Sequence, residues 1–289
     1  MTRKIRVGIV ATASRLDRST ADRVVALAAR HFPAVELAVH PQCHLSAGHF
    51  AGDDAARAAA FLEIANDPAF DALWFARGGY GSGRIAERAL PQLSEAARAK
   101  TYLGYSDAGV LLAGLYARGF PGVAHGPMPS DINREGDINR EGGEAAVLRA
   151  LSYLAGRATD ALEPSVAGGA TGGAKYAAFN LTTFSQLIGT PWQPDLAGHV
   201  LMLEEVSEYM YRIDRSLFHI TSNPGIRRVA GIRLGRCSAI PPNDPDFGQT
   251  EEQIARHWCA AAGIPYLGRA DIGHDAGNKV VPFGAPRIA

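Results

Sequence analysis

The first candidate for chemistry is a serine at a predicted tight turn. The segment Leu103-Gly104-Tyr105-Ser106-Asp107 joins an apolar run to a strongly apolar helical pattern, which predicts a strand, a turn and a helix. At such a turn the Ser106 hydroxyl is available as a nucleophile, and the Asp107 N–H at the helix start can stabilise an oxyanion. The pattern departs from G-x-S-x-G, because Ala108 stands at the second glycine position. On this segment alone, Ser106 is either a nucleophile or only the N-cap of the helix.

A glycine-rich loop follows another predicted strand, in Arg77-Gly78-Gly79-Tyr80-Gly81-Ser82-Gly83-Arg84. Its glycines allow the backbone to approach a ligand closely and to present N–H groups to an anion or an oxyanion. The loop lacks the spacing of GxxxxGK[ST] and of GxGxxG. It therefore favours an oxyanion or carboxylate site over a nucleotide phosphate site.

A serine nucleophile needs a base, and the base needs an acid that orients it. Of nine histidines, His274 is the best candidate base, because it lies between glycines after a predicted strand. Glu204 and Glu205 end the apolar strand 200–203, and strand alternation directs them to opposite faces. Only one can face the crevice. A buried acid without a partner is costly, so a functional role is predicted for one of the two.

The elements that must position these residues alternate between strand and helix. We expect strands at 6–12, 34–40, 72–76 and 101–104, and helices at 19–31, 53–66, 83–90 and 107–118. This alternation predicts an α/β domain of the flavodoxin or glutamine-amidotransferase kind, with a parallel sheet covered on both faces. Its ligand crevice is expected at the carboxyl ends of the strands.

A change in composition predicts a second domain. Residues 156–175 are rich in Gly, Ala, Thr and Pro and are interpreted as a linker between domains at 1–155 and 176–289. In the second part we expect helices at 181–187, 211–222 and 251–262, strands at 199–204 and 229–234, and further late strands. This predicts a mixed α/β domain that carries Glu204 and His274.

A tandem duplication lies at 131–142, where Asp131-Ile132-Asn133-Arg134-Glu135-Gly136 is followed by a second copy. The period is too short for a solenoid. The polar units indicate an extended surface loop. A neutral duplication and a loop that covers the substrate remain open.

The composition of the chain restricts its partners. Among 289 residues, 29 Lys and Arg balance 29 Asp and Glu, so no overall charge attracts nucleic acid or an anionic membrane. The three cysteines, Cys43, Cys237 and Cys259, lie outside any metal-ligand spacing, which argues against a disulfide framework and structural zinc and favours reduced thiols in the cytoplasm. The apolar run 7–13 is interpreted as a first strand rather than a signal peptide. No run of about 18 apolar residues predicts a membrane-spanning helix.

Together these residues resemble the LD-carboxypeptidase family of serine peptidases, which includes microcin C immunity-type peptidases. The resemblance covers nearly the whole chain. The segments that carry it, in order, are 50–57, Arg77-Gly78-Gly79-Tyr80-Gly81, Gly104-Tyr105-Ser106-Asp107, His125-Gly126-Pro127-Met128, 187–192, Leu203-Glu204-Glu205, Pro242-Asn243-Asp244 and Gly273-His274.

The resemblance implies a Ser-Glu-His triad of Ser106, Glu204 and His274, and it selects Glu204 over Glu205. It implies oxyanion donors at the backbone N–H groups of Asp107 and Gly79, and no metal or cofactor. The implied substrate is a murein tetrapeptide, from which the enzyme releases terminal D-alanine during peptidoglycan recycling in the cytoplasm. A homodimer is implied as well. Arg77 and Tyr80 are interpreted as substrate contacts. For the terminal carboxylate, Arg77 and Arg84 are both candidates, and a role of either in bracing the glycine loop stays open.

Two positions depart from the family pattern, and two other functions stay open. Glu205 stands where the family usually has Asp, and Phe179-Asn180-Leu181 replaces a Gly-Gly-Asn-Leu run. One alternative is an immunity-type peptidase that cleaves aminoacyl-nucleotide amides; the duplicated segment has no aromatic residue to stack on a nucleobase, which favours murein. The other is a non-catalytic sugar- or nucleotide-binding module in which Ser106 only caps a helix.

Overall fold

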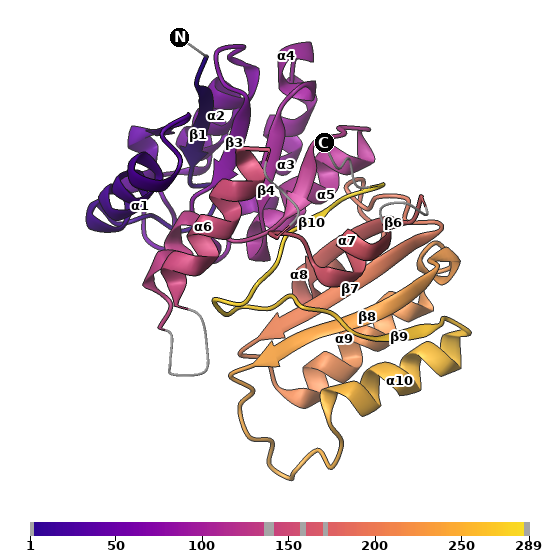
Figure 1. Ribbon diagram of the computed structural model, residues 1–289. Helices are drawn as coiled ribbons and strands as arrows, with labels where there is room; N and C mark the ends of the chain where they lie inside the picture. Colours follow the sequence, from indigo (N-terminus) through magenta and orange to yellow (C-terminus); the bar gives the residue numbers. More distant parts are fainter. Residues whose placement is uncertain (1–2, 136–141, 157–159, 170–172, 286–289) are drawn as a thin grey trace.

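The computed structural model describes residues 3–135, 142–156, 160–169 and 173–285 (Figure 1). The first part of the chain forms a six-stranded sheet with the order β10-β5-β4-β3-β1-β2. Its strands are β1 (Ile5–Val10), β2 (Val35–Val39), β3 (Ala72–Phe75), β4 (Thr101–Gly104), β5 (Val123–His125) and β10 (Val281–Pro282). The first five are parallel and follow the order of flavodoxin-like domains, which confirms the predicted fold class.

Helices cover both faces of this sheet because its strands are apolar on both sides. They are α1 (Arg18–His31), α2 (Asp54–Asn66), α3 (Ser82–Ala89), α4 (Glu95–Arg98), α5 (Gly109–Ala117) and α6 (Gly143–Leu154). On β1, Val7 and Ile9 pack in the core that α1 and α6 close, whereas Val10 packs in the opposite core with α2, α3 and α5. The alternation along the strand thus fixes which helices lie on which face.

The second part of the chain forms a four-stranded sheet in the order β6-β7-β8-β9. Its strands are β6 (Lys175–Asn180), β7 (His199–Val206), β8 (Gly231–Ser238) and β9 (Tyr266–Arg269), and they are parallel throughout. The core on one face of this sheet is closed by α8 (Leu181–Leu187), α9 (Met210–Ser222) and α10 (Glu251–Ala262). A second α/β domain, as predicted, is therefore present.

The end of the chain returns to the first sheet. Beyond β9 it crosses the face of the second sheet and climbs to β10, which pairs antiparallel with β5 (Figure 1). The side chain of Val281 is fully buried there. The antiparallel strand therefore lies in the first sheet and not in the second. The bounds of the two domains, 1–155 and 176–289 with a linker at 156–175, remain a prediction. The linker range contains a short helix, α7 (Pro164–Gly169).

The apolar run at the start of the chain forms β1, which lies between β3 and β2 in the sheet, and this confirms the strand interpretation. Cys43, Cys237 and Cys259 are free thiols. In the described ranges, no helix combines the length and the apolar character that crossing a membrane requires.

Candidate active site

The loops at the carboxyl ends of β1, β3, β4 and β5 meet at one edge of the first sheet. Ser14, after β1, donates its backbone N–H to the Gly78 carbonyl oxygen at 3.4 Å, and Ser130, after β5, donates to the Ala76 carbonyl oxygen at 3.1 Å. The Ser106 turn, directly after β4, lies between these loops. The prediction that chemistry-bearing residues follow the strands agrees with this arrangement.

Ser106 lies at a strained turn between strand and helix. The chain leaves β4 at Gly104, forms a short 3-10 helix at Ser106–Ala108 and continues into α5. Ser106 has a φ of +58°, a left-handed conformation that is rare for a residue with a side chain and costs about 1–3 kcal/mol. The N-cap positions are Tyr105 and Ala108, and the Ser106 hydroxyl forms no hydrogen bond within the described parts of the chain. The interpretation of Ser106 as a helix N-cap is therefore wrong.

The glycine loop packs directly on the Ser106 side chain. A Cβ atom on Gly78 would lie 2.8 Å from the Ser106 Oγ, so only glycine fits at this position. Gly79 has a φ of +116°, and a Cβ there would lie 2.3 Å from the Ser14 Oγ. The Gly79 N–H donates no hydrogen bond to another described residue. An unpaired N–H close to a serine hydroxyl suits an incoming oxyanion.

Asp107 ties the glycine loop to the Ser106 turn. Its buried carboxylate accepts hydrogen bonds from the backbone N–H groups of Gly81 at 3.2 Å and Ser82 at 2.8 Å. Burial raises the pKa of Asp107 above its ordinary value, while the Ser82 and Gly81 donors act in the opposite direction. The sequence analysis considered only the backbone N–H of this residue. Its side chain fixes the two halves of the site relative to each other.

Arg57, which the sequence analysis missed, supports the glycine loop from within. Its side chain is completely buried. Its guanidinium donates to the carbonyl oxygens of Thr12 and Gly81, the latter at 2.8 Å, and pairs with Asp54. Nothing in the local sequence marks an arginine in the middle of α2 as buried, because its acceptors lie on other loops.

Arg57 and Arg84 both pair with Asp54, which gives a matched pair of variants. Arg57→Met removes a buried cation and leaves two carbonyl oxygens without a donor, so we expect it to lower the free energy of unfolding by about 3–5 kcal/mol. Arg84→Met removes only an exposed, solvent-screened partner at 2.9 Å and is expected to cost far less. Urea unfolding followed by circular dichroism measures both. Equal losses would contradict this role for Arg57.

A buried Glu–His pair lies at the carboxyl edge of the second sheet. The Glu204 Oε2 is 2.5 Å from the His274 Nδ1, and the Glu204 carboxylate is fully buried. Burial lowers the pKa of His274, but the charge of Glu204 and its hydrogen bond outweigh this, so the pKa lies above its ordinary value. The His274 Nε2 is buried and has no hydrogen-bond partner among the described residues. This nitrogen is left to act on another group.

Glu205 differs from its neighbour in every contact. Its oxygens accept hydrogen bonds from the Asn180 side chain, from the backbone and hydroxyl of Thr182, and from the Val206 N–H. The two side chains have separate sets of partners, as alternation along β7 predicts. Glu205 is a satisfied structural acid at the start of α8, whereas the hydrogen bond of Glu204 goes to a histidine.

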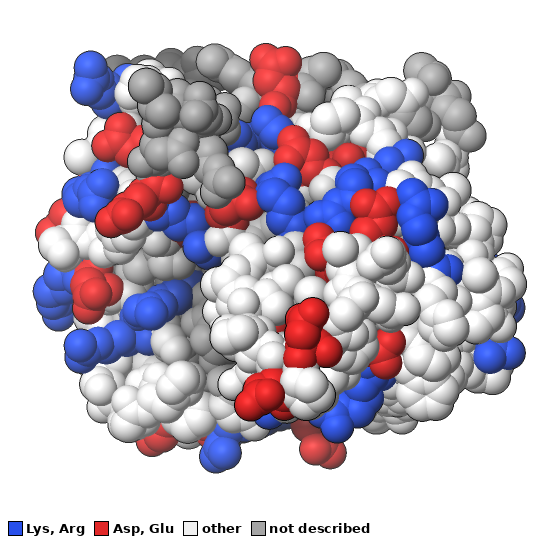
Figure 2. Space-filling model, turned by 90° about the horizontal axis from the view of Figure 1, so that it is seen from below, with Lys and Arg blue, Asp and Glu red and all other residues white. Residues whose placement is uncertain are grey.

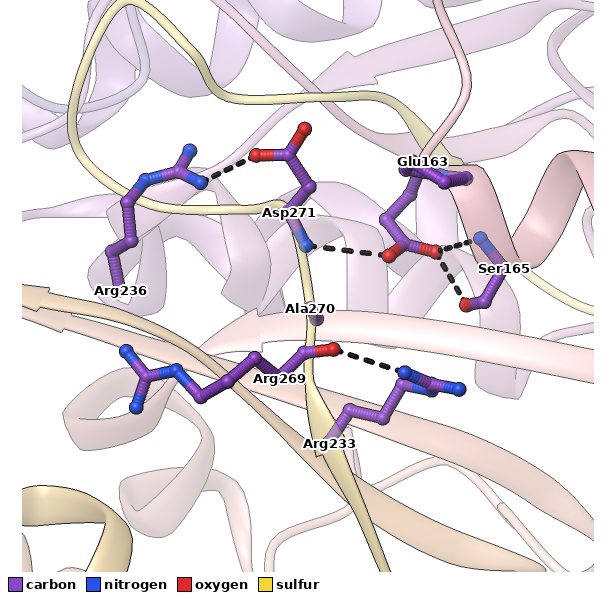
Figure 3. Close-up of a pocket in the computed structure, with 8 residues that line it drawn as sticks. Glu163, Ser165, Arg233, Arg236, Arg269, Ala270 and Asp271 are labelled. Carbon is purple, nitrogen blue, oxygen red and sulfur yellow. Dashed lines mark hydrogen bonds and ion pairs between the residues drawn. The ribbon is translucent and has the colours of Figure 1, made fainter.

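β8 holds the His274 loop against Glu204. A Cβ atom on Gly235 would lie 2.8 Å from the Glu204 Cβ and 2.7 Å from Ile272, so glycine is needed for this close approach. Arg236 pairs with Asp271 and Asp275, which flank His274, at 2.5 Å each. Figure 3 shows the Arg236 guanidinium directed at Asp271. Two ion pairs thus brace the loop on both sides of the imidazole.

Tyr105 joins the two halves of the site. Its ring centroid is 4.8 Å from that of His274, and Tyr105 precedes Ser106 in the chain. Its hydroxyl donates to the Asp131 Oδ1 at 2.9 Å and accepts from the Arg134 Nη2 at 2.7 Å. Tyr105 therefore brings the Ser106 turn next to the His274 loop, and within the described residues no hydrogen bond joins the Ser106 hydroxyl to the His274 Nε2.

The first copy of the duplicated segment is not an extended surface loop. Residues Pro129–Asn133 form a 3-10 helix, and Asp131 and Ile132 are buried. The physical reason is the network with Tyr105, which holds the Asp131 carboxylate inside the molecule. Gly136 of the first copy and residues 137–141 of the second copy lie outside the described residues.

The predicted substrate contacts occupy different places. Arg77 is exposed, and its one acceptor among the described residues is the Arg15 carbonyl oxygen, at 3.3 Å. Tyr80 is 56% exposed and lies in an aromatic cluster with His49 and Phe50. Arg84 is engaged by Asp54. Of the two arginines considered for a carboxylate, only Arg77 is free of an acidic partner in the described part of the chain.

The charged side chains on the surface are mixed in sign. Figure 2 shows basic and acidic side chains interleaved on the face that it presents, with no large field of one sign. Within the described ranges, no three His, Cys, Asp or Glu side chains are grouped as metal ligands.

Comparison with known proteins identifies the family to which the chain belongs. Residues 7–126 match the model of the LD-carboxypeptidase N-terminal domain, and residues 174–287 match that of the LD-carboxypeptidase C-terminal domain. A putative carboxypeptidase of Synechocystis is 31% identical over 245 residues, covering 84% of this chain and 77% of the relative. The murein tetrapeptide carboxypeptidase of Pseudomonas aeruginosa is 30% identical over 242 residues, covering 76% and 73%.

Two solved structures share the fold. A muramoyltetrapeptide carboxypeptidase from Oxalobacter formigenes matches with a TM-score of 0.76 at 19% identity, covering 98% of this chain and 96% of the other. The microcin C7 self-immunity protein MccF matches with a TM-score of 0.75 at 17% identity, covering 98% and 92%. At these identities the likeness concerns the fold alone.

Proposed function

We propose, from the premise that this chain belongs to the LD-carboxypeptidase family, that it is a serine carboxypeptidase with a triad of Ser106, Glu204 and His274. The observation that carries the proposal is the buried Glu204–His274 pair at 2.5 Å, whose imidazole packs on Tyr105, the residue before a serine held at a φ of +58°. A hydrogen-bonded acid and imidazole next to an unpaired hydroxyl is the arrangement that activates a serine.

In the proposed mechanism, the Ser106 Oγ attacks the carbonyl carbon of the scissile amide while the His274 Nε2 takes the hydroxyl proton. Glu204, hydrogen-bonded to Nδ1, keeps the imidazole in the required tautomer and stabilises the imidazolium. The backbone N–H groups of Asp107 and Gly79 stabilise the oxyanion. His274 then returns the proton to the departing amine, and an acyl-enzyme remains.

Water completes the cycle by the same route. His274 takes a proton from the water, the hydroxyl attacks the acyl carbon, and the proton passes to Ser106 as the ester bond breaks. No step calls on a group beyond these residues and water.

The proposed substrate is a murein tetrapeptide, cleaved at the L,D amide bond to release terminal D-alanine. The names of two relatives support it: the murein tetrapeptide carboxypeptidase of Pseudomonas aeruginosa and a probable murein peptide carboxypeptidase of Bacillus subtilis, which is 29% identical over 241 residues. A cytoplasmic location, a homodimer and a substrate contact at Tyr80 belong to the same proposal.

The test is a parallel incubation with an L,D-linked tetrapeptide and an aminoacyl-nucleotide amide, with products identified by mass spectrometry. We expect D-alanine from the tetrapeptide and a far slower reaction with the nucleotide. The reverse preference would assign the chain to the immunity-type activity. Tight binding of either compound without turnover would indicate a binding module instead.

A further inference from the structure

A cavity of about 410 Å³ opens beside the glycine loop, a size typical of small-molecule sites. It is lined by Leu16, Asp17, Thr20, Arg77, Ser130, Asp131, Asn133 and Arg134. Two of these residues are arginines from separate loops, one after β3 and one after β5. The sequence analysis considered Arg77 for a carboxylate but did not consider Arg134.

Both arginines are connected to the turn that carries the proposed nucleophile. Arg77 precedes Gly78, whose backbone packs on the Ser106 Oγ, and Met128 approaches the same point. Arg134 donates its Nη2 to the hydroxyl of Tyr105, the residue before Ser106, at 2.7 Å. The cavity is therefore connected to the Ser106 turn through Gly78 on one side and Tyr105 on the other.

The acids of the cavity leave some N–H donors of its arginines unused. Asp131 is buried, and its oxygens are taken by the Tyr105 hydroxyl, the Met128 N–H and the Arg134 Nε. The other acid, Asp17, is exposed and lies 3.8 Å from Arg15. Asp131 therefore occupies only part of the hydrogen-bonding capacity of the Arg134 guanidinium.

The unused donors point to a carboxylate ligand. Among the described residues, the Arg134 Nη1 has no hydrogen-bond partner and Arg77 has no acidic partner. A guanidinium held by Asp131 and Tyr105 is already oriented, so it loses little freedom on binding. Two planar cations with free N–H groups match a carboxylate better than a neutral amide.

We propose that this cavity binds the free C-terminal carboxylate of the peptide, with Arg134 as the fixed ligand and Arg77 as the second. The inference rests on the proposed function and deepens it, because a carboxylate site beside Ser106 restricts cleavage to the last residue. Arg84, the other arginine of the glycine loop, has no part in it because Asp54 holds it.

The test compares two tetrapeptides that differ only in ending as D-alanine carboxylate or D-alanine carboxamide. We expect the wild-type chain to prefer the acid by about 100-fold in kcat/KM, the size of a charge-assisted contact. Arg77→Gln and Arg134→Gln should each reduce this ratio by about tenfold or more. Arg84→Gln is the matched control and should leave the ratio unchanged.

The carboxamide peptide serves as an internal standard, because a loss of folded protein lowers both rates equally and leaves their ratio intact. Equal cleavage of acid and amide by the wild type would overturn the carboxylate site, as would an unchanged ratio in both glutamine variants. Cleavage of neither peptide would instead refute the proposed function, so the two failures are distinguishable.

Discussion

Replacing Ser106 with alanine is expected to reduce kcat for D-alanine release by about 10⁴- to 10⁶-fold. In the proposed mechanism the Ser106 Oγ forms the acyl bond, and this variant removes that atom, whereas no hydrogen bond of the fold depends on the Ser106 hydroxyl in the described structure. The measurement is the rate of D-alanine release from the tetrapeptide, together with urea unfolding of the same preparation.

A control isolates the role of the hydroxyl from that of the backbone. Alanine keeps a Cβ at a φ of +58°, whereas Ser106→Gly removes the strain of that conformation. We expect both variants to be inactive, with the glycine variant the more stable of the two. Substantial activity in either one would exclude Ser106 as the nucleophile.

Replacing Glu204 with glutamine is expected to lower kcat by about 10⁴-fold, because an amide no longer fixes the tautomer or stabilises the imidazolium. Burial acts to lower the pKa of His274, and Glu204 holds it above its ordinary value. The base must be neutral to accept a proton, so wild-type activity falls as the pH drops through this raised pKa. In the variant we expect the acid limb of the kcat profile to move to lower pH.

The matched control is Glu205→Gln, one residue further along β7. Glu205 is bonded to Asn180, Thr182 and Val206 rather than to a histidine. This variant is expected to lose stability while keeping the acid limb of the wild type. An acid limb that moves in Glu205→Gln but not in Glu204→Gln would reverse the assignment.

Several features were predictable because their causes are local. The apolar run before Gly104 and the apolar helix after it predicted the strand, turn and helix around Ser106. Alternation along 200–205 predicted that the side chains of Glu204 and Glu205 would point to opposite faces of the strand. Their separate hydrogen-bond partners agree with this. The order of strands and helices was enough to place the glycine loop and the Ser106 turn at the same edge of the sheet.

The remaining features depend on contacts between distant segments. From the sequence, Arg57 would be placed on the exposed face of a helix. It is buried because its guanidinium donates to carbonyl oxygens of two other loops, at Thr12 and Gly81. Asp131 lies in a polar repeat, yet it is buried because its carboxylate accepts hydrogen bonds from Tyr105 and Arg134. The two-residue strand β10 is too short to carry a pattern, and only its pairing with β5 defines it.

The most direct test of the account is covalent labelling with a fluorophosphonate, which phosphonylates an activated serine. Mass spectrometry of the digested protein should find one adduct per chain, on Ser106, and the Ser106→Ala variant should remain unlabelled. A protein that releases D-alanine at full rate without forming that adduct, or with the adduct on a different residue, would contradict the central claim.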